Sequence, residues 1–517
     1  MCPEIYPQQA EELQSVIAVR FSVPQQTFYP MSVAIIIRDT PFLTIIRRLL
    51  TMVIVPVLLG SICAAALADD LPDLGDESAS VISAIDEQKI GRQFLREARE
   101  QLPFVRDPEL NAYVTSLGEK LVAHSDTPQM QFRFYVIQDS QLNAFAVPGG
   151  HIAVHTGLIL ATEHESELAA VLSHEIAHIS QRHLPRMLAR SKEQTVPAMA
   201  AIAAAILLGG DAGTAALAAT NAAIIERQLA YTRDFEEEAD ALGIRTLARA
   251  NLDPGAMPVF FERMQRWSRI YESDVPEYLR THPLTYKRIA ESQARAESYP
   301  PAPQNSDDDF LHVKAKIRAL FSQRSSSSTI TEIEPTDHDS DLERYAQALS
   351  NTSGRRFDAA RKELQALVAK HPDQVTYFIA QAENEMAAGE FEAALDVYSD
   401  AVERFPSSDL LQHYYASSLV RTGYSAKAKT LLRKAIRKDP KNPELYEMLA
   451  RAEGDIGALF EAHQALAEFH YLNADTKHAL EELRTALGYA GDSFYAKASA
   501  EARIREIEAE ATLYDES

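Results

Sequence analysis

Apolar residues recur at helical spacing between residues 166 and 183, and this pattern predicts an amphipathic helix. The recurring positions are Leu168, Val171, Leu172, Ile176 and Ile179. No proline or glycine interrupts the run before Pro185. Thr162 and Glu165 have the spacing of a capping box, which places the start of the helix just upstream of the apolar run.

A strand-like pattern precedes this helix. Residues 132–137 are rich in strand-forming side chains, and the segment 143–154 is typical of a hairpin with a Gly-Gly bend. One interpretation is that the hairpin serves only the fold. The other is that its first half is an edge strand, which can hold an extended peptide by main-chain hydrogen bonds. The residues of that predicted substrate strand are Asn143, Ala144, Phe145 and Ala146.

The last third of the chain repeats with a period of 34 residues. The recurring residues are Pro372, Pro406 and Pro440, Ala360, Ala394 and Ala428, and Gly389, Gly423 and Gly457. This period predicts tetratricopeptide repeats, with about four helix pairs stacked into a curved solenoid. Such an array either recruits protein partners, which we favour, or only packs against the rest of the chain.

Composition changes divide the chain between these patterns. Proline-rich residues 300–303 and the aspartates at 307–309 mark a break, residues 310–321 predict one helix, and the serine-rich segment 323–341 predicts a flexible linker. The alanine-rich segment 196–225 predicts a pair of buried helices joined at a glycine turn. The alternative is a mobile lid, or a surface that contacts a membrane or a partner.

The amino-terminal segment predicts export. Arg47 and Arg48 precede an apolar run that ends in Ala66-Leu67-Ala68. This order is typical of a secretory signal peptide, so we expect residues 1–68 to be removed and the remainder to reach the periplasm. The part before Arg47 is long for a signal, which makes Met31 an alternative start. An uncleaved anchor is the other interpretation, and it exports the remainder equally.

Charge and cysteine content exclude several classes of function. The formal net charge is −23, which argues against nucleic acid and against a broadly anionic membrane surface as a partner. The two cysteines, Cys2 and Cys63, both precede the predicted cleavage site. A disulfide framework and a cysteine-based metal site are therefore not expected.

The predicted helix of residues 166–183 carries the sequence His174-Glu175-Ile176-Ala177-His178. Two histidines four residues apart lie on one helical face and can bind one zinc ion. Glu175 can then act as general base: it takes a proton from the attacking water and passes it to the leaving amine. We therefore predict one Zn²⁺ per chain and peptide-bond hydrolysis, with the alternative that both histidines are ordinary polar positions of a half-buried helix.

A catalytic zinc site needs a third protein ligand. The acidic run Glu236-Glu237-Glu238 lies on a later predicted helix and can supply it, but helical patterning does not choose among the three carboxylates. The pair His-Glu-x-x-His and Glu-x-x-Ala-Asp resembles the zinc peptidase family that contains the CAAX prenyl endopeptidases and HtpX, over roughly residues 80–290. This resemblance implies that Glu236 is the third ligand and that Asp240 orients a ligand histidine.

The same resemblance implies functional roles for two residues in the segment 280–289. In periplasmic members of the family, the histidine that matches His282 lies near the metal. His282 is thus expected to be an inhibitory fourth ligand or, alternatively, to stabilise the oxyanion. Arg288 is expected to hold this segment or to polarise the substrate.

These observations predict a mainly α protein with a small β-sheet. A zincin-like metalloprotease domain at 69–322 precedes the linker, a tetratricopeptide α-solenoid at 342–490, and a helix with an acidic tail at 491–517. The resemblance implies degradation of misassembled proteins on the outer-membrane assembly route. It also implies repeats that dock to the barrel-assembly machinery, with peripheral membrane contact. A chaperone or adaptor with a mostly latent zinc site is the alternative, whereas the absence of several spanning helices in the sequence argues against a prenyl-protease-like membrane enzyme.

Overall fold

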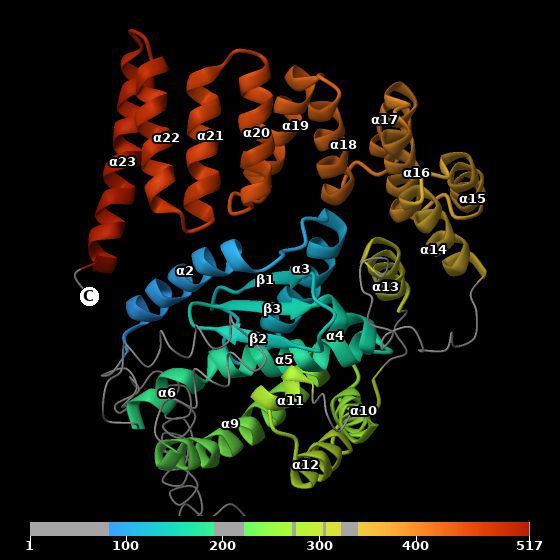
Figure 1. Ribbon diagram of the computed structural model, residues 1–517, viewed down its shortest axis with the longest axis vertical. Helices are drawn as coiled ribbons and strands as arrows, with labels where there is room; N and C mark the ends of the chain where they lie inside the picture. Colours follow the sequence, from blue (N-terminus) through green and yellow to red (C-terminus); the bar gives the residue numbers. More distant parts are fainter. Residues whose placement is uncertain (1–81, 191–221, 271–275, 303–306, 322–339, 516–517) are drawn as a thin grey trace, which may run out of the picture. The chain divides into compact units, whose positions relative to one another are not determined.

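The computed structural model describes residues 82–190, 222–270, 276–302, 307–321 and 340–515 (Figure 1). The predicted signal peptide, most of the alanine-rich segment and nearly all of the serine-rich linker lie outside the described residues. Within the described ranges, no helix is both long and apolar enough to cross a membrane.

The first region combines a small sheet with several helices, as the sequence predicts. Its strands are β1 (Arg133–Ile137), β2 (Ala144–Val147) and β3 (His151–His155). Its helices are α2 (Ala84–Gln101), α3 (Pro108–Ala123), α4 (Thr156–Ala161), α5 (Glu165–Ser180), α6 (His183–Arg190), α9 (Ala222–Arg249), α10 (Ala256–Ile270), α11 (Glu277–Thr281), α12 (Tyr286–Ala296) and α13 (Asp308–Phe321). The helix predicted at 310–321 is thus confirmed as α13.

The sheet has the strand order β1-β3-β2, with β3 parallel to β1 and antiparallel to β2. The predicted hairpin is therefore β2 and β3, and β2 lies at one edge of the sheet. Gly149 and Gly150 form its bend with φ values of +87° and +86°, a region that favours glycine. The carbonyl of Gly150 accepts a hydrogen bond from the amide of Arg133, which fixes the bend against β1.

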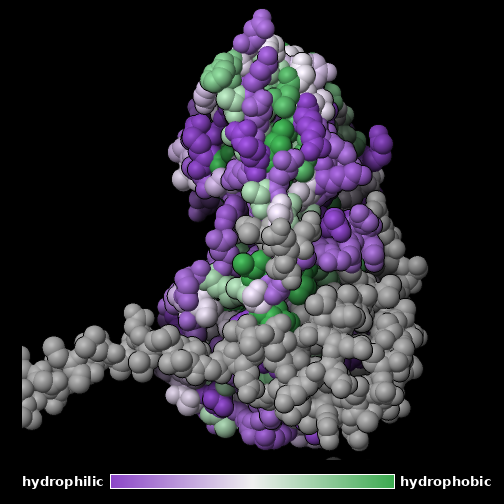
Figure 2. All heavy atoms as spheres, turned by 90° about the vertical axis from the view of Figure 1, so that its left-hand side faces the viewer, coloured by the Kyte–Doolittle hydropathy of each residue, from purple (hydrophilic) through white to green (hydrophobic). Residues whose placement is uncertain are grey.

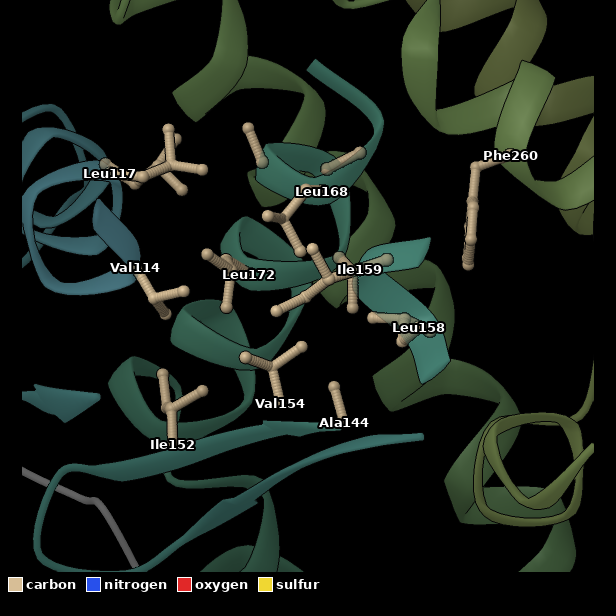
Figure 3. Close-up of a cluster of buried hydrophobic side chains, with 14 of the residues drawn as sticks. Val114, Leu117, Ala144, Ile152, Val154, Leu158, Ile159, Leu168, Leu172 and Phe260 are labelled. Atoms are coloured by element: carbon tan, nitrogen blue, oxygen red, sulfur yellow. The ribbon is translucent and has the colours of Figure 1, made fainter. Parts of the chain in front are cut away.

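Alternate residues of the strands fill two separate hydrophobic clusters, because side chains of a strand point to opposite faces. One face carries Ile152 and Val154 into a core shared with α3, α4, α5 and α10. Figure 3 shows these two side chains directed toward Leu168 and Leu172 of α5. The opposite face packs against α2 through Phe94 and Ala98. The sheet therefore buries both faces and supports α5.

The predicted capping box at Thr162 and Glu165 is wrong. Thr162 instead ends α4, where its buried hydroxyl donates to the carbonyl of Ile159. His164 is the N-cap of α5 and makes no side-chain cap bond. The side chain of Glu167 accepts from the amide of Glu163 just before the helix. Thr162, which the sequence pattern placed at the start of α5, therefore belongs to the end of the short helix α4 immediately upstream.

Helix α9 approaches α5 closely at Gly243. A side-chain carbon at this position would lie 3.1 Å from the hydroxyl of Ser173 and 3.3 Å from the backbone nitrogen of His174. It would also lie 2.8 Å from a methyl carbon of Met257. The absence of a side chain at Gly243 therefore brings the acidic part of α9 beside the two histidines of α5.

The repeat region consists of helices that pack in sequence order (Figure 1). They are α14 (Ser340–Ser353), α15 (Phe357–Lys370), α16 (Val375–Ala388), α17 (Phe391–Arg404), α18 (Asp409–Arg421), α19 (Ser425–Lys438), α20 (Pro443–Asp455), α21 (Leu459–Leu472), α22 (Thr476–Tyr489) and α23 (Phe494–Asp515). On the face shown in Figure 2, hydrophilic side chains predominate over the C-terminal helices, with narrow hydrophobic strips between them.

The period of 34 residues corresponds to one pair of these helices. Gly389, Gly423 and Gly457 end the first helix of successive pairs with positive φ values of +87°, +83° and +78°. Ala360, Ala394 and Ala428 are fully buried where helices cross. The described helices form five pairs rather than about four, because α23 packs against α22 and completes one more.

The Gly-Gly bend allows a test of the sheet. In Gly150→Ala, the added carbon would lie 2.0 Å from the carbonyl oxygen of Gln131 in a backbone conformation that alanine avoids. We expect a loss of more than about 1 kcal/mol of stability, measured as a lower Tm. Gly488→Ala is the matched control. Gly488 lies in helix α22, and a side-chain carbon there would have no other atom within 4 Å. Equal Tm values for the two variants would contradict this account of the bend.

Candidate metal centre

Three elements bring the predicted site residues together. Helix α5 carries His174, Glu175 and His178, and α9 carries Glu236. His282 follows directly after α11. The side chains of His174, Glu175 and Glu236 are at most 3% exposed, and His178 retains 16%. A largely buried cluster with one partly open side is suited to a metal ion that must also reach a substrate.

The ligand atoms have the spacing of a metal site. Nε2 of His174 lies 2.9 Å from Nε2 of His178 and 3.3 Å from Oε2 of Glu236. Nε2 of His178 lies 3.4 Å from Oε1 of Glu236. Ligand atoms bound about 2.1 Å from one zinc ion in tetrahedral geometry would be about 3.4 Å apart. These three side chains therefore fit three corners of one coordination sphere.

The carboxylate of Glu175 supports the same interpretation. Its side chain is 1% exposed, and its buried Oε1 has no hydrogen-bond partner among the described residues. A buried carboxylate oxygen without a hydrogen bond is costly, so such an atom is expected to have a functional partner. Its position next to His174 in α5 suits a base that receives a proton at the metal centre.

Arg288 and Asp240 support the ligands from behind. Oδ1 of Asp240 lies 2.9 Å from Nδ1 of His174, on the side of the ring opposite to Glu236. The guanidinium of Arg288 donates to both oxygens of Asp240 at 2.8 Å, and its Nη1 lies 2.8 Å from Oε2 of Glu236. Nη1 of Arg288 also donates to the carbonyl of Pro283. This bond connects Arg288 with the segment after His282, and the role expected for Arg288 stays a prediction.

A similar support exists behind His178, and the sequence patterns did not indicate it. Nδ1 of His178 lies 2.9 Å from Nδ1 of His183, whose Nε2 lies 3.2 Å from Oε2 of Glu238. Arg186 donates to the same carboxylate oxygen at 2.9 Å. His183 therefore lies behind the ring of His178 as Asp240 lies behind that of His174, and both positions are suited to orienting a ligand ring. The signal available in the sequence was the extended motif in which His183 follows His178 by five residues.

Burial and neighbouring charges set the protonation of the ligands. Burial disfavours a charged imidazole, but the carboxylates of Asp240 and Glu236 outweigh it and raise the pKa of His174 to about 10. Burial opposes charge on Glu236 as well, yet the imidazoles of His282, His174 and His178 keep its pKa well below the usual range. Glu236 is thus ionised. A metal ion bound here would have to displace a proton from His174, so metal affinity would rise with pH.

His282 lies at the remaining corner. Its Nδ1 lies 3.0 Å from Oε1 of Glu236 and 3.3 Å from Nε2 of His174. Its Nε2 lies 3.4 Å from Oε1 of Glu175. His282 therefore lies close to the three predicted ligands and, at the same time, to the predicted base Glu175.

The predicted substrate strand lies beside this centre. Strand β2 packs against α5, and the edge of β2 away from β3 pairs with no other described strand. The helix that precedes His282 reaches the start of this strand, because the amide of Tyr278 donates to the carbonyl of Leu142 at 3.0 Å. Asn143 follows immediately, and its buried Oδ1 has no hydrogen-bond partner among the described residues. The segment with His282 thus contacts both the metal centre and the approach to β2.

The support behind His178 yields a prediction. His183→Ala should weaken zinc binding by about 10- to 100-fold, because the ring of His178 loses its orienting partner. Competition with a chromogenic chelator measures this affinity. His164→Ala is the control, since His164 is the N-cap residue of α5, the helix that carries His178, and its side chain is 68% exposed and makes no cap bond. An unchanged affinity in His183→Ala would show that His183 has no positioning role.

Comparison with known proteins agrees with this geometry. The model of peptidase family M48 matches residues 108–296, and a tetratricopeptide-repeat model matches residues 409–452. The beta-barrel assembly-enhancing protease of Yersinia pestis is 30% identical over 446 residues, which cover 85% of this chain and 92% of that protein. The putative beta-barrel assembly-enhancing protease of Vibrio cholerae is 32% identical over 457 residues, covering 86% and 94%.

Another relative matches a shorter part of the chain. The mitochondrial metalloendopeptidase OMA1 of Schizosaccharomyces pombe is 32% identical over 178 residues, which cover 34% of this chain and 50% of that protein. The resemblance stated from the two sequence motifs is confirmed by these matches. The chain belongs to peptidase family M48 and, over most of its length, to the group of the beta-barrel assembly-enhancing proteases.

Proposed function

We propose that this metallopeptidase is a zinc-dependent endopeptidase of the bacterial periplasm that degrades misassembled outer-membrane proteins. The observation that carries the proposal is the convergence of His174, His178 and Glu236 beside the buried carboxylate of Glu175. Two imidazoles and one carboxylate form the ligand set of several zinc peptidases, and they leave one position for the reaction. That arrangement serves hydrolysis better than it serves a purely structural metal site.

In the proposed reaction, the protein side chains hold the reactants and move the protons. A bound zinc ion supplies Lewis acidity, which polarises a carbonyl and activates water near neutral pH. Glu175 accepts the proton of the attacking water and later transfers it to the amine that leaves. Asp240 and Arg288 are positioning residues, because they contact the ligands His174 and Glu236 and lie behind them.

The neighbouring sheet edge supports a peptide as substrate. We propose that residues 143–146 bind an extended chain through main-chain hydrogen bonds, which are insensitive to side-chain identity. Unfolded or stalled proteins expose such extended segments. A low sequence preference therefore fits a role in quality control.

The partners and the location rest on the full-length relatives and on the repeats. Two relatives that match more than 90% of their own length are named for enhancing beta-barrel assembly. We propose that this chain acts on the same assembly route, and that residues 342–490 recruit the barrel-assembly machinery or its clients. The signal peptide proposed for residues 1–68 would deliver the chain to the periplasm, where peripheral contact with the outer membrane is compatible with the recruitment.

We further propose that His282 keeps the resting enzyme latent. Its ring lies at the fourth corner of the centre and beside Glu175, where the attacking water and the scissile carbonyl must bind. The same segment is bonded to the start of β2. Substrate entry would therefore require His282 to leave, and this latency also explains how an adaptor role could coexist with a complete peptidase site.

Substitution of the base tests the enzyme hypothesis. Glu175→Gln should lower casein cleavage by about 10²- to 10⁴-fold, because the amide cannot accept the proton. Its zinc content, measured by atomic emission, should equal that of the wild type, because Glu175 is not a ligand. Full cleavage activity at normal zinc content would contradict the mechanism. Full rescue of an envelope defect by Glu175→Gln in cells would favour the adaptor hypothesis instead.

Substitution of the fourth-corner residue tests latency. His282→Ala should cleave casein faster than the wild type, because the ring no longer blocks the centre. Thr281→Ala is the control, since the hydroxyl of Thr281 contacts only backbone carbonyls of its own helix. Slower cleavage by His282→Ala with the zinc retained would show that His282 takes part in catalysis.

A further inference from the structure

A second cluster of metal-binding side chains lies far along the chain from the peptidase centre, at the turn between α21 and α22. His470 lies in the last turn of α21, Asp475 is the N-cap of α22, and His478 lies in the first turn of α22. One donor atom from each of the three side chains lies within 4.8 Å of the others. The proposed peptidase mechanism uses none of these residues.

Both imidazoles direct the same ring nitrogen toward one carboxylate oxygen. Nδ1 of His478 lies 2.6 Å from Oδ2 of Asp475, and Nδ1 of His470 lies 3.4 Å from the same oxygen. The centroids of the two imidazole rings are 5.4 Å apart. Ligand atoms on a tetrahedral zinc ion would be about 3.4 Å apart. The donor atoms of His470 and Asp475 already have this spacing. The distance between Nδ1 of His478 and Oδ2 of Asp475 would need to lengthen by less than about 1 Å.

The backbone of the turn holds the three residues in place. Ala474 has a φ of +64°, which reverses the chain within one residue, and the amide of Asp475 donates to the carbonyl of His470 at 2.9 Å. Oδ1 of Asp475 accepts from the amide of His478 as the helix cap. The cap therefore fixes the carboxylate through one oxygen and leaves Oδ2 facing the two imidazoles.

A helix cap by itself would account for Asp475 and His478 but not for His470. The other histidine of α21, His463, shows what an ordinary paired histidine looks like in this region. Its Nδ1 lies 2.6 Å from Glu482, and its ring stacks on Tyr489, but no third ligand is present among the described residues. The turn differs because a second imidazole converges on a carboxylate that is already paired.

We propose that His470, Asp475 and His478 bind a divalent transition-metal ion, and that this ion ties α21 to α22. Imidazole nitrogens select zinc, nickel and copper over magnesium and calcium. The side chains are 23%, 29% and 55% exposed, so water can fill the remaining positions. To bind the ion, Nδ1 of each imidazole must carry no proton, so that any proton on Nδ1 passes to solvent and each neutral ring holds its proton on Nε2. This ion is additional to the one at the peptidase centre.

Zinc titration of the full-length protein tests the proposal. After treatment with a chelator, ZnCl₂ is titrated by calorimetry into wild type, His470→Gln, His478→Gln and His463→Gln. The two turn variants should each bind one zinc ion fewer than the wild type, whereas His463→Gln should bind as many. Zinc should also raise the Tm of the wild type and of His463→Gln more than that of the turn variants, because an ion bound to the folded state stabilises it.

The comparison is independent of the peptidase site, because it counts the difference between chains that share that site. Equal zinc stoichiometry in the wild type and both turn variants would overturn the proposal. Loss of one ion in His463→Gln as well would also overturn it, because it would indicate unspecific binding to surface histidines. Circular dichroism that matches the wild type confirms that each exposed substitution leaves the helices folded.

Discussion

The peptidase region depends on one constraint: the buried carboxylates at the candidate metal centre need positive charge beside them. Glu175, Glu236 and Asp240 bring three carboxylates into a space that is almost closed to water. A buried charge persists only where opposite charges and hydrogen bonds offset its loss of hydration. Arg288 supplies one fixed positive charge to two of these carboxylates. A divalent cation bound by His174, His178 and Glu236 would supply the further positive charge that this set of acids favours.

Backbone packing makes this convergence possible. The sheet supports α5 through Ile152 and Val154, which pack against Leu168 and Leu172 of that helix. Gly243 lets α9 approach α5 so closely that a side-chain carbon there would crowd Ser173 and the backbone nitrogen of His174. Arg288 then ties α12 to α9 and to the backbone at Pro283. Substitutions at these supports should therefore act on the metal centre although they do not contact the reacting atoms.

Some residues of the site could be predicted from the sequence pattern alone, whereas others needed the family resemblance. His174, Glu175 and His178 followed from one helix, because a spacing of four residues fixes a common face. Glu236 could not be distinguished from Glu237 and Glu238 by helical pattern, because the choice depends on how two helices pack. Only the family resemblance made that distinction.

Features that depend on contacts between elements escaped the sequence patterns. His183 lies beyond a chain reversal at Arg182, whose φ is +52°, so no helical periodicity connects it with His178. Thr162 belongs to the end of α4, a helix of six residues that is too short to show a period. The last helix pair keeps the sequence register only in part: Gly491 follows Gly457 by 34 residues with a φ of +53°, but Ala474 replaces the repeated proline. His470, Asp475 and His478 lie on two helices, and the turn at Ala474 alone brings them together.

The most direct test of the central claim is the position of the metal itself. Crystals of the full-length protein, grown with zinc and measured on both sides of the zinc absorption edge, would locate each ion by its anomalous scattering. The account predicts a peak bounded by Nε2 of His174, Nε2 of His178 and a carboxylate oxygen of Glu236. No peak among these three side chains at full zinc saturation would contradict it.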